Sequence, residues 1–162
     1  MDYISYSVLR KYCHEWRIFL FYLQANLGGN YNNAVGNLSL ASSTSGIHNV
    51  AMGYFSLNFN QGGNYNTAIG NYSLMNNVSG TSNACLGYNA LYGNTGNLNT
   101  SIGYQSLQPT TSGSSNTTLG SNAGQYLYST SSYNTFIGAT SGPALSDTTI
   151  YTYSTAIGSK RI

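Results

Sequence analysis

Most of the chain repeats one pattern of apolar, small and polar positions. From residue 29 onward an aliphatic residue stands directly before a glycine eight times, and these glycines are successively 17, 17, 17, 16, 17, 18 and 20 residues apart. A short alternating run between glycines is typical of a β-strand bounded by turns. A period near 17 residues is too short for helical-pair repeats and suits one turn of a solenoid, called a coil below. The sequence therefore predicts an all-β fold, a parallel β-solenoid (β-roll) of about eight coils over residues 28–162.

Several columns of equivalent positions run through these coils. The glycine column is Gly36, Gly53, Gly70, Gly87, Gly103, Gly120, Gly138 and Gly158. The aliphatic column, directly before it, is Val35, Met52, Ile69, Leu86, Ile102, Leu119, Ile137 and Ile157. The small-residue column, one position earlier, is Ala34, Ala51, Ala68, Cys85, Ser101, Thr118, Phe136 and Ala156. The asparagine column is Asn32, Asn49, Asn66, Asn83, Asn99, Asn116 and Asn134.

Each column has an expected role. Glycines suit corners, where the backbone adopts positive φ or approaches another backbone. Stacked asparagine amides can hydrogen-bond from coil to coil. Neighbouring side chains of a strand face opposite ways, so the aliphatic and small-residue columns lie on opposite faces. We expect the aliphatic column to fill the core. A further column of leucines follows each glycine by four residues (Leu40, Leu57, Leu74, Leu91 and Leu107) until Gly124 and Gly142 interrupt it.

The coils resemble repeats of trimeric fibre proteins. The stretches that carry the resemblance are NYNNAVGNLSL, IHNVAMGYFSL, NYNTAIGNYSL, SNACLGYNAL and LNTSIGYQSL. They are similar to the β-roll heads of trimeric autotransporter adhesins and to the repeats of phage tail-fibre proteins. The resemblance covers about residues 28–158 and implies a homotrimer with the small-residue column buried between subunits. It marks an architecture rather than a chemistry.

Residues 1–27 have a different pattern. Five apolar residues spaced three and four apart predict a short α-helix with a heptad seam: Leu9, Tyr12, Trp16, Phe19 and Leu23. Such a helix would trimerise or dock the rod, or would fold back to cap the first coil; these two readings stay open. A membrane-surface helix is a weaker alternative, because only part of it is basic.

Charge and reactive residues argue against several classes of function. The net charge is +2, and residues 18–146 contain no Asp, Glu, Lys or Arg, so no basic face for nucleic acid is predicted. No apolar run is long enough to span a membrane. Cys13, His14 and Glu15 are adjacent, and adjacent helical residues do not face each other. His48 has no nearby carboxylate in the sequence. We expect no enzyme activity, no metal site and no cofactor.

Two kinds of function remain. The favoured one is a structural fibre or surface-appendage protein, a self-associating rod that spaces or presents an adhesive surface outside a cell or on a virion. Tyr54, Tyr88 and Tyr104 follow the glycine column and are candidates for contact with a cell-surface glycan or another surface. The alternative is an ice-binding solenoid, based on one shared column of hydroxyls: Thr67, Thr100, Thr117, Thr135 and Thr155.

The C-terminal stretch YSTAIGSKRI contains the last repeat and no polar capping segment. An uncapped strand edge invites pairing with another strand. We therefore expect axial self-association of the rods as a hypothesis.

Overall fold

A computed structural model describes residues 29–108, 112–144 and 148–159. In these ranges the chain is a parallel β-solenoid with no helix. The predicted N-terminal helix and its seam lie outside the described residues. The strands are β1 (Asn33–Val35), β2 (Val50–Met52), β3 (Thr67–Ile69), β4 (Ala84–Leu86), β5 (Thr100–Ile102), β6 (Thr117–Leu119), β7 (Thr135–Ile137) and β8 (Thr155–Ile157).

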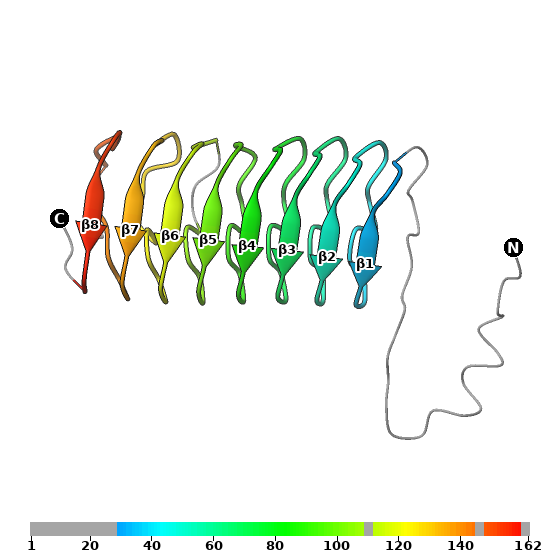
Figure 1. Ribbon diagram of the computed structural model, residues 1–162, viewed down its shortest axis with the longest axis horizontal. Coiled ribbons are helices and arrows are strands. Elements are labelled where there is room, and N and C mark those ends of the chain that lie inside the picture. Colours follow the sequence, from blue (N-terminus) through cyan, green and yellow to red (C-terminus); the bar gives the residue numbers. More distant parts are fainter. Residues whose placement is uncertain (1–28, 109–111, 145–147, 160–162) are drawn as a thin grey trace, which may run out of the picture.

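The eight strands form one parallel sheet in sequence order (Figure 1). Equivalent positions pair directly, so that Ala34 lies opposite Ala51 and Ala51 opposite Ala68. The rest of each coil crosses back to start the next strand. This return segment also bonds from coil to coil; for example, Leu57 N donates to Ser73 O at 3.0 Å. The repeat period therefore sets the register along the whole coil.

The core lies on the side of the sheet opposite to the one expected. The small-residue column points inward, with Ala51, Ala68 and Cys85 at most 3% exposed. The aliphatic column points outward, and Met52 and Leu86 are 47% and 48% exposed. The prediction that the aliphatic column forms the chain's own core is wrong. Several members are exposed outright (Val35, Met52, Leu86, Ile102, Leu119 and Ile157), and Ile69 and Ile137 are partly buried.

The reason for this orientation is the space inside a coil. The leucines of the return segments are fully buried and fill the interior (Leu40, Leu57, Leu74, Leu91 and Leu107). A close-packed interior has no room for a second large residue opposite each leucine. The inward strand position is therefore small in most coils, and the two flanking strand positions face outward.

A change of core packing explains where the leucine column stops. Gly124 and Gly142 occupy its positions in the sixth and seventh coils, and there the small-residue column carries the fully buried Phe136. A Cβ atom built at Gly124 would lie 3.0 Å from Thr118 Cγ2, 3.2 Å from Leu107 Cδ1 and 3.4 Å from the Phe136 ring. The phenyl ring thus takes the space that leucines fill elsewhere.

The glycine column permits the close stacking of coils. Gly53 has φ of +136°, and a Cβ there would lie 2.6 Å from the carbonyl of Gly70. Any larger residue would push neighbouring coils apart, because the obstacle is backbone rather than a flexible side chain.

Candidate binding surfaces

An asparagine ladder holds neighbouring coils together inside the stack. Asn49 Oδ1 accepts hydrogen bonds from the backbone N–H and the side-chain amide of Asn66, at 2.9 and 3.1 Å. The Asn66 amide also donates to Gly80 O at 2.9 Å. The pattern runs from Asn32 to Asn134, and Ser154 N donates to the last amide oxygen. This column is structural and is closed to ligands by its burial.

Sequence reasoning missed a second set of buried amides. Asn60, Asn77 and Asn94 are fully buried in the return segments of three consecutive coils. Asn77 donates to Asn60 Oδ1 and to Gly80 O, both at 2.9 Å. In the sequence, each of these asparagines follows a glycine of the glycine column by seven residues. Only three coils have an asparagine there, so the pattern was not recognised.

The outward side of the sheet carries the aliphatic column and a parallel polar column. Threonine occupies that polar column in β3, β5, β6, β7 and β8; Asn33, Val50 and Ala84 occupy it elsewhere. Thr117 and Thr155 are exposed, and Thr67, Thr100 and Thr135 are partly buried. We call these two columns the outer face. It contains no charged residue and runs over all eight strands.

The three tyrosines predicted as contact residues are exposed, at 40% for Tyr54, 42% for Tyr88 and 51% for Tyr104. They are also packed along the stack. The rings of Tyr88 and Tyr104 are parallel at 5.5 Å, and Tyr54 meets Tyr72 edge-on at 5.3 Å. Phe55 stacks on Tyr72 at 5.9 Å.

Another aromatic stack was not predicted. The His48 ring lies between the rings of Tyr31 and Tyr65, at 4.8 and 5.2 Å, with all three nearly parallel. Tyr133 and Tyr153 stack at 4.9 Å farther along the chain. All five residues have positive φ, near 60°, and occupy equivalent turn positions. The residue types were visible in the sequence, but their shared position was not recognised.

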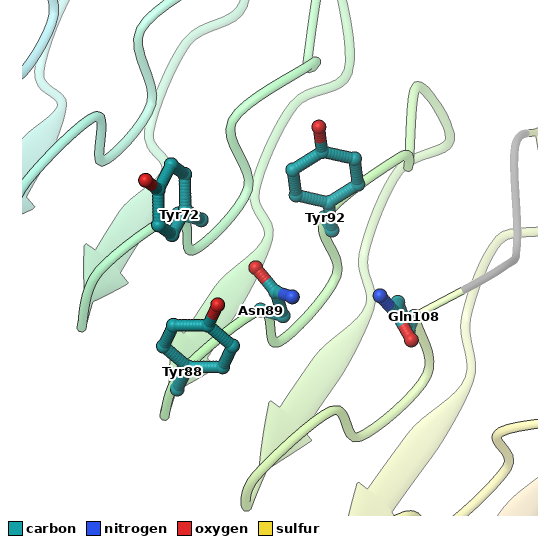
Figure 2. Close-up of a pocket in the computed structure, with 5 residues that line it drawn as sticks. All are labelled: Tyr72, Tyr88, Asn89, Tyr92 and Gln108. Carbon is teal, nitrogen blue, oxygen red and sulfur yellow. The ribbon is translucent and has the colours of Figure 1, made fainter.

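An open hollow of about 360 Å³ interrupts the aromatic surface. Figure 2 shows its lining: Tyr72 from the third coil, Tyr88, Asn89 and Tyr92 from the fourth, and Gln108 from the fifth. The Asn89 Oδ1 atom is buried and accepts no hydrogen bond. Desolvation, and then the nearby phenols of Tyr54, Tyr88 and Tyr92, raise the pKa of Tyr72.

The described residues contain no group of His, Cys, Asp or Glu that could hold a metal ion. Burial raises the pKa of the Cys85 thiol to about 12, which suppresses thiolate chemistry at neutral pH. Cys13, His14 and Glu15 lie outside the described ranges. Within those ranges, no helix is long and apolar enough to cross a membrane.

Comparison with protein-family models, with curated proteins and with solved structures gives no match.

Proposed function

We propose that the chain is a structural subunit that assembles through its outer face into a homo-oligomeric, trimeric rod. The exposed aliphatic column is the observation that carries this proposal. Soluble monomers rarely leave a long contiguous apolar strip uncovered, and such strips are typical of protein interfaces. The absence of charge on the outer face also favours burial, because no ion would lose its hydration.

Rotational symmetry suits this surface. In a closed homo-oligomer the same strip of each subunit meets its copies, and equal coil spacing would place aliphatic residues at matching heights. We infer three subunits from the resemblance to trimeric fibre repeats, but the proposed interface differs from the one that the resemblance implies. The subunits meet through the aliphatic column, because the small-residue column is enclosed within each chain.

The rod spaces or presents an adhesive surface outside a cell or on a virion, with an exposed glycan as its partner. Its buried amides and repeated backbone bonds support a durable role of this kind. Axial stacking of rods belongs to the same proposal: within the described residues, β1 and β8 each pair with a single strand, and free strand edges invite pairing.

Glutamate substitutions on the outer face test the assembly. We expect Leu86→Glu with Ile102→Glu to convert the trimer to a folded monomer, because burying two carboxylates per subunit between chains is prohibitive. The measurement is mass by sedimentation equilibrium, with circular dichroism to verify folding.

Val78→Glu is the matched control, since Val78 is 42% exposed but lies in the segment between β3 and β4 rather than on the outer face. It should remain trimeric. An unchanged mass for the double variant would contradict the proposed interface.

Ice binding is a second candidate, and one observation favours it. The threonine column faces outward, and it is continuous over β5, β6, β7 and β8. A regular array of hydroxyls and methyl groups on a flat, uncharged sheet suits ordered water. Assembly through the outer face would cover this array, so the two functions exclude each other there. Thermal hysteresis from a monomeric wild-type chain would favour ice binding, and a trimer without hysteresis would reject it.

A further inference from the structure

The hollow beside Tyr72 lies where a short run of two aromatic side chains in one column ends. Phe55 and Tyr72 occupy equivalent positions in successive coils and stack on each other, and the next coil carries Asn89 at that position. The backbone is the same at all three, with φ of 55°, 59° and 55°. The shorter asparagine therefore leaves unfilled the space that an aromatic ring would occupy.

The lining of this hollow combines aromatic surface with a few polar groups. Three tyrosines supply ring faces and hydroxyls, and Asn89 and Gln108 supply amides. The Asn89 Oδ1 atom has no hydrogen-bond partner among the described residues, but it is buried, so the groups open to a ligand are the phenol hydroxyls and the Gln108 amide. The hollow is shallow and open to solvent, and its exposed lining is more polar than apolar because it includes the phenol hydroxyls and the two amides. It therefore suits a ligand that offers both an apolar face and hydrogen-bonding groups.

We infer that this hollow binds a pyranose unit of a neutral carbohydrate. A pyranose has an apolar C–H face that packs on a tyrosine ring, and hydroxyls at its edge that both donate and accept hydrogen bonds. The phenol hydroxyls of the three tyrosines and the amide of Gln108 bond the hydroxyls at the edge of the sugar. No charged residue lies in the described ranges to attract an acidic sugar. The inference deepens the proposed function, and its biological use rests on that function.

The test fills the hollow without disturbing the stack. Asn89→Phe places a ring where Phe55 and Tyr72 already show that a ring fits. The probe is an immobilised panel of neutral α- and β-linked oligosaccharides with sialylated oligosaccharides beside them, followed by titration of the best binder. We expect wild type to bind neutral members, and Asn89→Phe to weaken that binding about tenfold or more.

Asn122→Phe is the matched control. Asn122 occupies the same column, has φ of 56° and also has an unpartnered Oδ1, but it does not line the hollow. Its substitution should leave binding unchanged. Absence of binding to every neutral member, or equal binding by wild type and Asn89→Phe, would overturn the inference.

The mass of each sample separates this result from the proposed function. A trimer that binds no sugar refutes the carbohydrate site alone. A monomer whose sugar binding is weakened by Asn89→Phe refutes the proposed assembly alone.

Discussion

At the scale of single residues, the stack depends on side chains that bond to the next coil rather than to their own. Asn83 donates to Asn66 Oδ1 and Gly96 O, and its own oxygen accepts from the N–H and amide of Asn99. Leucines of the return segments adopt the left-handed conformation, with φ near 50°, which costs roughly 1–2 kcal/mol each. Bonds between coils must outweigh that strain.

Replacing one ladder amide should therefore be costly. Asn83→Ala leaves the backbone N–H of Asn99 without its acceptor and removes one of the two bonds of the Asn99 amide, all in a buried site. It also leaves Gly96 O with only the longer bond from Asn94, at 3.3 Å. We expect a loss of about 3 kcal/mol or more in unfolding free energy, measured by urea denaturation. Asn37→Ala, at an exposed position outside the strands, should change stability by less than about 0.5 kcal/mol. Similar losses for both variants would show that the ladder does not stabilise the stack.

The inward direction of the small-residue column predicts the behaviour of Cys85. In a Cys13→Ser background, Cys85 should resist a thiol reagent in the native protein, whereas Val78→Cys, at an exposed position off the outer face, should react. Rapid native labelling of Cys85 would contradict the orientation.

The raised pKa of Cys85 also predicts a pH effect. The unfolded thiol loses its proton near pH 9, whereas the folded thiol keeps it to about pH 12, so stability falls across that window. In the Cys13→Ser background, Cys85→Ala should show a shallower fall in urea midpoint. Parallel curves for the two proteins would mean that the thiol does not contribute.

At the scale of elements, the sequence predicted the repeat unit but not its orientation. The gap between glycines located all eight strands, because parallel stacking requires coils of equal length. The alternation of Ala and Ile placed them on opposite faces, and alternation alone does not say which face is inside. Hydrophobicity favoured isoleucine for the interior. The buried leucines of the return segments already fill the interior, so the small strand residue faces inward and the isoleucine faces outward.

The exchange of leucine for phenylalanine in the sixth and seventh coils gives an element-scale prediction. Phe136→Ala should cost about 3–5 kcal/mol by leaving a cavity. Gly124→Leu alone should also destabilise, because its Cβ would lie 3.0 Å from Thr118 Cγ2 and the rest of the side chain would need the space of the Phe136 ring. Combined, the two changes should cost less than their sum, since they restore the packing of the earlier coils. If the losses in unfolding free energy of the two single variants simply add in the double variant, the Phe136 ring does not replace a leucine side chain in the core.

The hollow was out of reach of sequence reasoning for a related reason. It is formed by residues of three coils, and its cause is the absence of a ring at Asn89 rather than the presence of a motif. Tyr88 was recognised as a candidate contact residue, whereas Tyr72, Tyr92 and Gln108 became its neighbours only through stacking. The role of residues 1–27 stays a prediction.

At the scale of the whole molecule, the main surface feature is the exposed aliphatic column. The eight strands stand side by side with their arrows parallel (Figure 1), so the aliphatic column continues along the described stack. Burying aliphatic surface stabilises association by roughly 25 cal/mol per Å² before the entropy of association is subtracted. A strip repeated on every strand can exceed that cost, whereas a single exposed leucine cannot.

The decisive measurement is the mass of the full-length wild-type chain by sedimentation equilibrium over a wide concentration range. The chain weighs 17.3 kDa, and we predict a species of three times that mass, with multiples of it where rods stack end to end. A single 17.3 kDa species at every concentration would contradict the assembly through the outer face.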